Sequence, residues 1–122
     1  RSLPVLVVDD SAVMRKVICL SLEELDIRRV DTAAGGEEAL QKLRTRRYSL
    51  VICDYIMPGM TGLQLFGAMD ADPTMRGTPF LLMTTQDAGA GMTLREHERL
   101  KAIAIKPFTT EALKRRIEEV CR

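Results

Sequence analysis

The sequence is poor in aromatic residues and carries little excess charge. Its 122 residues include no tryptophan, two tyrosines, three phenylalanines and one histidine, and its formal net charge is +1. Because eighteen basic and seventeen acidic residues are mixed along the chain, no strong electrostatic field draws the molecule to nucleic acid or to an anionic membrane. We therefore expect partners that are recognised locally, with neither nucleic acid nor a membrane among them.

Long apolar runs and paired cysteines are also missing. The longest apolar runs, Pro4 to Val8 and Leu50 to Cys53, are far shorter than the ~20 residues of a membrane-spanning helix, and the N-terminus lacks a signal-peptide pattern. Cys19, Cys53 and Cys121 lie far apart without metal-type spacing, which favours buried or half-buried thiols in a reducing compartment. We expect a cytoplasmic location.

The remaining composition is that of one globular domain. The apolar share is 46% and the charged share 29%, which excludes a disordered or collagen-like chain. A chain of this length buries roughly two-thirds of its unfolded surface around a single core. We expect residues 1–122 to form one domain, with no room for a second.

Short apolar runs alternate with amphipathic segments along the chain. Strands are expected at residues 4–8, 29–32, 49–53, 79–83 and 102–105. Helices are expected from Ser11 to Leu25, over 37–46, from the Pro58-Gly59 turn to a stop before Asp72-Pro73, from near Leu94, and from Thr109 or Thr110 onward. Strands that are apolar on both faces and alternate with helices imply a parallel sheet covered on both sides. The predicted fold class is α/β, with a doubly wound, five-stranded parallel sheet.

Chemically active side chains stand where these strands end. They are Asp9, Asp10, Asp54, Thr84 and Lys106, and the ligand site of a doubly wound sheet lies at the carboxyl ends of its strands. Two carboxylates about 4 Å apart repel by about 4 kcal/mol at an effective dielectric near 20, so three of them need a cation or a raised pKa. Oxygen ligands of this kind suit Mg²⁺, which keeps some of its waters and favours phosphate groups.

The same edge offers the groups of a phosphoryl-transfer site. Lys106 supplies a point charge and Thr84 a hydroxyl, which can hold the oxygens of a phosphoryl group in transfer, and Asp54 at the centre is then the nucleophile. Taken one at a time, the residues also have structural explanations: a helix cap for Asp9 and Asp10, a turn for Asp54, and a solvated charge for Lys106.

Taken together, the motifs resemble those of response-regulator receiver domains, in the layout of the single-domain chemotaxis type. They are LVVDDS followed by MRK, VICDYIMPGMTG, PFLLMTT and IKPFTTEAL, and in this order they span nearly the whole chain. The resemblance implies the flavodoxin-like receiver fold with strand order 2-1-3-4-5. It also implies a two-component signalling module that accepts a phosphoryl group from a histidine kinase phosphohistidine and then switches a protein-interaction surface. The implied partners are a sensor histidine kinase or phosphotransfer protein and an unidentified downstream protein.

The resemblance also assigns roles to the residues at the sheet edge. Asp54 corresponds to the phospho-acceptor, and Thr84 and Lys106 to the hydroxyl and the charge that meet the phosphoryl group. The Mg²⁺ shell it implies consists of Asp9, Asp10, Asp54 and the backbone carbonyl of Ile56.

One position and one segment depart from the family pattern, and two further positions are expected to tune the kinetics. Ile103 occupies the place of the aromatic residue whose ring usually turns inward when the threonine moves, so the switch formed by Thr84 and residue 103 has no ring hydroxyl here. Ile56 and Gln86 flank the expected approach of water, and an apolar Ile56 cannot orient that water, so self-catalysed dephosphorylation is expected to be slow. The glycine-rich segment 86–91 predicts a long loop before a short fourth helix, with a regular helix that tolerates two glycines as the alternative.

Two other functions and one other ligand fit parts of the sequence. An aspartyl-phosphate hydrolase needs a second aspartate two residues after the first, and Ile56 at that position argues against an enzyme. A receiver-fold docking or ligand-binding module, with output independent of phosphorylation, is favoured by Ile103 and opposed by the intact acidic set. Arg28-Arg29 and Arg44 to Arg47 are interpreted as solvated faces, with an anionic ligand as the alternative.

Overall fold

The computed structural model describes residues 3–84, 102–105 and 109–121, with the side chains of 102–105 excepted. The strands are β1 (Val5–Val8), β2 (Val30–Ala33), β3 (Leu50–Asp54), β4 (Phe80–Thr84) and β5 (Ala102–Ile105). The helices are α1 (Ala12–Glu24), α2 (Gly36–Thr45), α3 (Gly62–Asp70) and α5 (Thr110–Val120).

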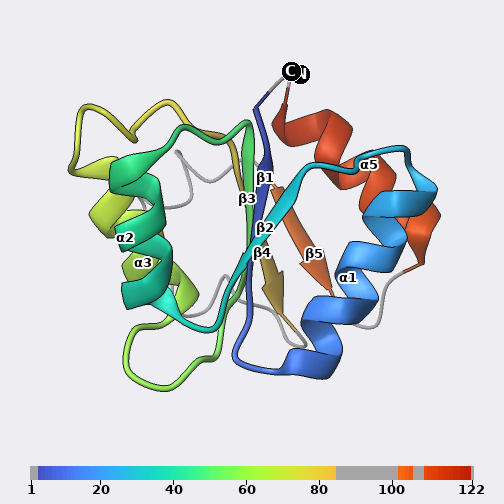
Figure 1. The fold of residues 1–122 in the computed structure, drawn as a ribbon, viewed down its shortest axis with the longest axis horizontal. Helices are drawn as coiled ribbons and strands as arrows, with labels where there is room; N and C mark the ends of the chain where they lie inside the picture. Colours follow the sequence, from blue (N-terminus) through green and yellow to red (C-terminus); the bar gives the residue numbers. More distant parts are fainter. Residues whose placement is uncertain (1–2, 85–101, 106–108, 122) are drawn as a thin grey trace.

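The five strands form one parallel sheet in the order β2-β1-β3-β4-β5. Figure 1 shows α2 and α3 on one face of the sheet and α1 and α5 on the other. The reversal of strand order at β1 places the carboxyl ends of β1 and β3 side by side, because Val8 pairs with Cys53. The predicted doubly wound α/β fold and its strand order are therefore confirmed.

The strands form where they do because both of their faces are buried. Every residue of β1, β3 and β4 is buried, and their side chains alternate between the two faces with period two. Leu6 and Val51 belong to the core cluster that includes residues of α2 and α3. Val7 and Ile52 belong to the other cluster, together with residues of α1 and α5. Two apolar layers thus hold the central strands rigidly on either side.

Side-chain caps fix the beginnings of three helices. The Ser11 hydroxyl accepts from the Met14 amide at the start of α1, and the Thr109 hydroxyl accepts from the Ala112 amide at the start of α5. Thr61 and Gln64 form a reciprocal capping box at the start of α3. The predicted cap of the last helix is therefore Thr109, and α3 ends before Asp72-Pro73 as expected.

Some details differ from the sequence prediction. β2, β3 and β4 each begin and end one residue later than the predicted strands 29–32, 49–53 and 79–83. Cys121 is exposed, whereas Cys53 is buried and Cys19 half-buried; the prediction was wrong for Cys121 because Val120 takes the inward position in the last turn of α5. The predicted fourth helix near Leu94 lies outside the described residues.

Within the part of the chain that the structure describes, no helix is long and apolar enough to cross a membrane.

Candidate functional site

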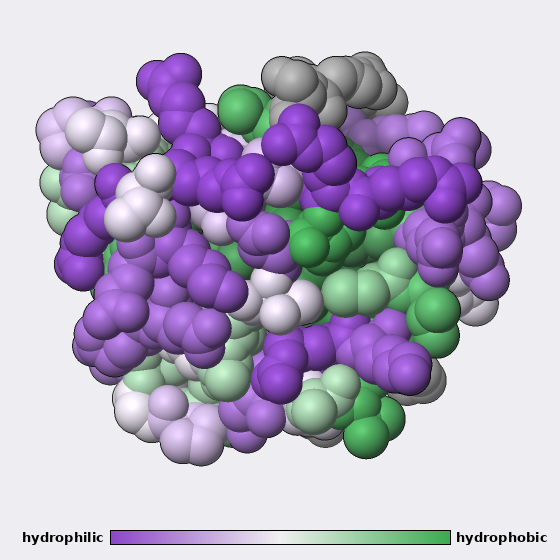
Figure 2. Space-filling view, viewed as in Figure 1, coloured by the Kyte–Doolittle hydropathy of each residue, from purple (hydrophilic) through white to green (hydrophobic). Residues whose placement is uncertain are grey.

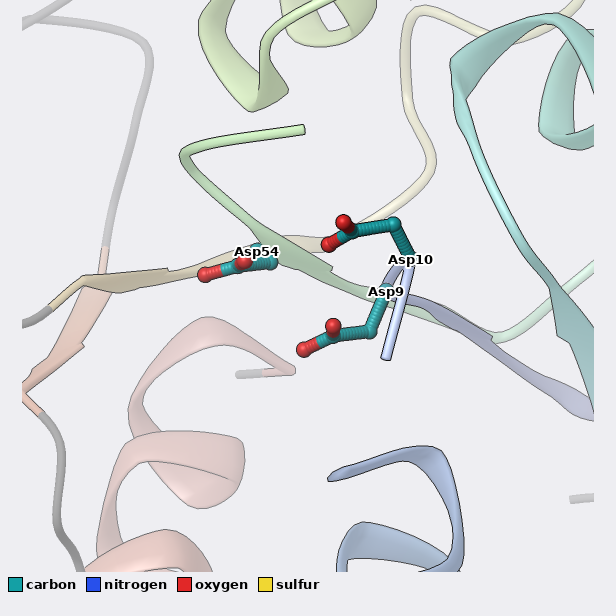
Figure 3. A group of neighbouring side chains, drawn as sticks. All are labelled: Asp9, Asp10 and Asp54. Carbon is teal, nitrogen blue, oxygen red and sulfur yellow. The ribbon is translucent and has the colours of Figure 1, made fainter. Parts of the chain in front are cut away.

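Three carboxylates meet at the carboxyl edge of the sheet. Asp9 and Asp10 directly follow β1, and Asp54 is the last residue of the neighbouring strand β3. One carboxylate oxygen of each lies within 4.8 Å of those of the other two, and Figure 3 shows the three side chains around the ends of these strands. Asp9 and Asp54 are buried, and Asp10 is exposed. The structure thus brings together the three acids that the sequence singled out.

The shared position of these acids has an electrostatic cost. Like charges at such separations repel, and the repulsion grows as water is removed from the two buried carboxylates. The negative charge also acts on Cys53: burial, and then the charges of Asp54 and Asp9, raise the pKa of its thiol. Cys53 therefore stays a neutral thiol at neutral pH and packs as an apolar side chain.

The turn between β1 and α1 is held by bonds to Asp9. The Ser11 amide donates to Asp9 Oδ1 at 2.9 Å, and Arg15 Nη1 reaches back from α1 to donate to the Asp9 carbonyl oxygen at 2.6 Å. The first bond orients the Asp9 carboxylate, and the second fixes the backbone from which Asp10 projects. Sequence reasoning missed this role of Arg15, although Arg15 stands one turn into a helix that begins beside the acids.

The loop between Asp54 and α3 is held at both ends. The Tyr55 amide donates to the Met83 carbonyl, and the Gly62 amide donates to the Tyr55 carbonyl, each at 2.8 Å. Gly59 has φ +80, a conformation that side chains rarely adopt, which confirms the predicted Pro58-Gly59 turn. The loop therefore leaves Asp54 along one fixed path.

Two residues of this loop have opposite environments. Met57 is buried, whereas 67% of Ile56 is exposed.

Met60 in the same loop packs against Gly36 at the start of α2, where a β-carbon on Gly36 would stand 2.6 Å from the Met60 sulfur. This contact ties the loop to α2, and sequence reasoning missed it because no local pattern reports such a close approach.

One of the remaining predicted site residues, Thr84, lies at the same edge. Thr84 is the buried last residue of β4, one position beyond the Met83 that pairs with Asp54. Thr84 pairs in turn with Ile105 of β5. Ile103 is the partner of Leu82 in the same ladder, and only its backbone is described. Lys106, Gln86 and the remainder of 85–101 lie outside the described residues.

The donor set fits a hard divalent cation. Three carboxylate oxygens, two of them on buried residues, converge within one ion's reach at a single edge of the sheet. Oxygen-only sites with an open, solvent-facing side suit Mg²⁺, which retains several waters. The same edge also presents a carboxylate, Asp54, that a rigid strand and a fixed loop hold in place. The arrangement can therefore combine cation binding with nucleophilic attack by a carboxylate.

Comparison with known proteins agrees with this geometry. The profile of the family described as response regulator receiver domain matches residues 5–118. The chemotaxis protein CheY of Pseudomonas aeruginosa is 31% identical over 116 residues, which cover 95% of this chain and 94% of that protein. Chemotaxis protein CheY-3 of Vibrio cholerae is 27% identical over 120 residues, 98% of this chain and 92% of that protein.

Solved structures share the fold over almost their full lengths. The chemotaxis response regulator CheY4 of Vibrio cholerae has a TM-score of 0.86 and 31% identity, covering 98% of this chain and 99% of that one. A putative response regulator from Chloroflexus aurantiacus has a TM-score of 0.88 and 26% identity, covering 99% and 98%. The resemblance drawn from the sequence motifs is confirmed by these matches.

Proposed function

This chain belongs to the response regulator receiver family, and on that basis we propose that Asp54 accepts a phosphoryl group from the phosphohistidine of a sensor histidine kinase or phosphotransfer protein. Proteins of this family are signalling modules of two-component systems rather than classical enzymes. The observation that carries the proposal is the convergence of Asp9, Asp10 and Asp54 within 4.8 Å at the carboxyl edge of the sheet.

Asp54 is the nucleophile in this proposal. One of its carboxylate oxygens forms a bond to phosphorus while the phosphorus–nitrogen bond of the donor breaks, and the imidazole nitrogen leaves with the electron pair. The strand β3 supports this role, because it is buried on both faces and ends on Asp54. A carboxylate held in one position meets the donor without first losing conformational freedom.

Asp9, Asp10, Asp54 and the backbone carbonyl of Ile56 would hold Mg²⁺ beside the acceptor. When bound, the ion neutralises charge on the carboxylates and on the phosphoryl oxygens. Arg15 and Ser11 support this set through the bonds that orient Asp9. Asp10 is the exposed member, and it faces the side from which the ion and the donor arrive.

Thr84 and Lys106 complete the proposed site. Thr84 stands at the end of β4, so its hydroxyl is close to the acceptor edge, and Lys106 follows β5 directly in the sequence. A hydroxyl donor and an ammonium group stabilise the phosphoryl oxygens as charge develops on them. We propose that movement of Thr84 towards the phosphoryl group starts the switch. In this chain Ile103 takes the place of the aromatic residue that is usual in the family.

The exposed apolar face of α1 is the proposed docking surface for the phosphoryl donor. Val13 is 75% exposed, Val17 46% and Leu20 52%, and they follow one another at helical spacing. In Figure 2, apolar side chains reach the surface in the right half of the view, where Figure 1 places α1. Because α1 begins two residues after Asp10, a partner that covers this face also reaches the acceptor.

Labelling with a phosphorylated histidine kinase tests the proposal. The wild-type chain should acquire the label in the presence of Mg²⁺, and Asp54→Asn should acquire none. Asp72→Asn is the matched control, because Asp72 is a half-buried aspartate just beyond the C-terminal end of α3 whose Oδ1 accepts from Thr74, a bond that asparagine can also make. Full labelling of Asp54→Asn would refute the acceptor assignment.

The proposed compartment is the cytoplasm, because its reducing conditions fit the free cysteines of the chain.

A further inference from the structure

The edge of the sheet opposite the acidic site carries two adjoining cavities. The first, about 760 Å³, is lined in part by Val5, Leu50 and Pro79, which stand at the amino ends of β1, β3 and β4. Figure 1 shows this edge at the end of the molecule where the α1–β2 connection and the last turn of α5 lie. The strands run about 3.3 Å per residue, so roughly 15 Å separates this edge from the carboxylates.

The two cavities share part of their lining. The second, about 450 Å³, shares Leu3, Ser49 and Pro79 with the first. We call the pair the amino-edge groove. Each cavity has the size of a small-molecule site, since such sites range from about 300 to 1,000 Å³. Leu3, which lines both cavities, is 41% exposed although it is a large apolar residue.

The larger cavity has an apolar floor. Besides Leu3, Val5, Leu50 and Pro79, it is lined by Leu25, Ile27, Ile117 and Cys121. Of its two acidic residues, Asp26 and Glu118, Asp26 already accepts from Arg28 at 2.8 Å, and Arg28 also lies 3.8 Å from Glu23. This cavity therefore suits the apolar body of a ligand better than its charged group.

The groove is richer in arginine than in acidic residues. Arg28 and Arg29 line the larger cavity and Arg46 and Arg47 line the smaller one, whereas the acidic residues among the described residues of the two linings are Asp26 and Glu118. The whole chain is nearly neutral, so this edge is locally positive while the opposite edge collects three carboxylates. A locally positive groove favours an anion.

Arg47 is the arginine best placed to bind that anion. Arg46 lies 3.0 Å from Asp31, whereas Arg47 makes no ion pair with any residue in the described part of the chain. Arg47 is exposed and lines the smaller cavity next to the hydroxyl-bearing residues Ser49 and Thr74. A guanidinium group offers five donors that match the oxygens of a carboxylate or phosphate.

We propose that the amino-edge groove binds a small organic anion, with its apolar body in the larger cavity and its carboxylate or phosphate beside Arg47. The site is separate from the proposed phosphorylation site, so its occupancy does not depend on the state of Asp54. Every ligand of this class has an apolar body and one anionic group. The apolar body is either aliphatic or planar.

Amide chemical shifts of the ¹⁵N-labelled chain test this site with two anions and their neutral counterparts. Octanoate with octan-1-ol tests an aliphatic body, and adenosine 5′-monophosphate with adenosine tests a planar one. At least one anion should give saturable shifts at the amides of Leu3, Arg47 and Ser49, and its neutral counterpart should bind more weakly. No saturable shift with either anion up to its solubility limit, or equal binding of the neutral compounds, would overturn the proposal.

Two variants test the assigned roles within the groove. Arg47→Gln should weaken binding of the anion about fivefold, as expected for one partly solvated ion pair, and Leu3→Ser should weaken it by removing apolar contact. Arg115→Gln is the matched control, because Arg115 is exposed on α5 and lines neither cavity. Melting temperatures establish that each variant is folded. Unchanged affinity in Arg47→Gln, or an equal loss in Arg115→Gln, would contradict the assignment.

Discussion

Gly62 lies so close to Asp54 that a β-carbon on Gly62 would stand 2.4 Å from the Asp54 carbonyl oxygen and 2.8 Å from Leu82 Cδ1. The first contact is with backbone, which cannot move aside as a flexible side chain can. The start of α3 therefore rests directly against the residue proposed as the phospho-acceptor, and the size of residue 62 sets the position of the Asp54 backbone.

The first prediction concerns this contact. Gly62→Ala should lower the free energy of unfolding by about 2 kcal/mol, the usual cost of overpacking a core, and should slow phosphorylation because the Asp54 backbone shifts. Gly67→Ala on the same helix meets nothing within 4 Å and should be more stable by about 0.5–1 kcal/mol. Chemical denaturation and phosphorylation rates measure both effects. Equal behaviour of the two variants would show that the contact does not position Asp54.

The second prediction separates donor docking from the chemistry at Asp54. Val17→Lys places a charge in the middle of the exposed apolar face of α1, so transfer from the phosphorylated kinase should fall by at least about tenfold, as expected where a central apolar contact is lost. Phosphorylation by a small donor such as acetyl phosphate should be unchanged, because that donor needs no docking surface. Lys114→Gln, an exposed change on α5, serves as the control. Loss of labelling with both donors would instead implicate the site itself.

A third prediction uses the repulsion among the carboxylates. Without divalent cations, Asp10→Asn should melt at a higher temperature than the wild type, because it removes one of three charges that lie within 4.8 Å. Mg²⁺ should raise the melting temperature of the wild type, since a ligand that binds only the folded state stabilises it. It should raise that of Asp10→Asn much less. A wild-type melting temperature that does not respond to Mg²⁺ would count against a cation site at this edge.

A fourth prediction concerns alkaline pH. Burial, and then the hydrogen bond to Asp31, raise the pKa of Tyr48 from 10.0 to about 12. Because the neutral phenol is favoured in the folded state, its contribution to stability is complete below pH 10 and is lost as the pH rises through about 12. Between these values, the wild type should lose up to roughly 2–3 kcal/mol more than Tyr48→Phe. Parallel stability curves for the two proteins would show that Tyr48 does not titrate in this way.

The sequence was sufficient to predict the elements whose pattern is local. Apolar runs such as Leu50 to Cys53 predicted strands because a strand buried on both faces needs apolar residues at every position. The carboxyl ends of parallel strands share one edge, so Asp10 and Asp54 were expected to meet, and they do. Hydroxyl side chains before amphipathic segments predicted caps, and Thr109 is one of them.

Contacts that depend on distances between elements could not be predicted in this way. The bond from Arg15 to the Asp9 carbonyl depends on the angle at which α1 leaves the sheet. The packing of Met60 against Gly36 depends on how closely α2 approaches the loop after Asp54. Neither quantity leaves a periodic pattern in the sequence, and both help to fix the loops that carry the site.

The central claim is that Asp54 carries the phosphoryl group, and mass mapping of the phosphorylated wild-type chain tests it most directly. After reaction with acetyl phosphate and Mg²⁺, the intact protein should gain the mass of one phosphoryl group. Fragmentation should place that group on the peptide that contains Asp54, and hydroxylamine should remove it, as expected for an acyl phosphate. A phosphoryl group on any other residue, or an unmodified Asp54 in a chain that binds Mg²⁺, would contradict the account.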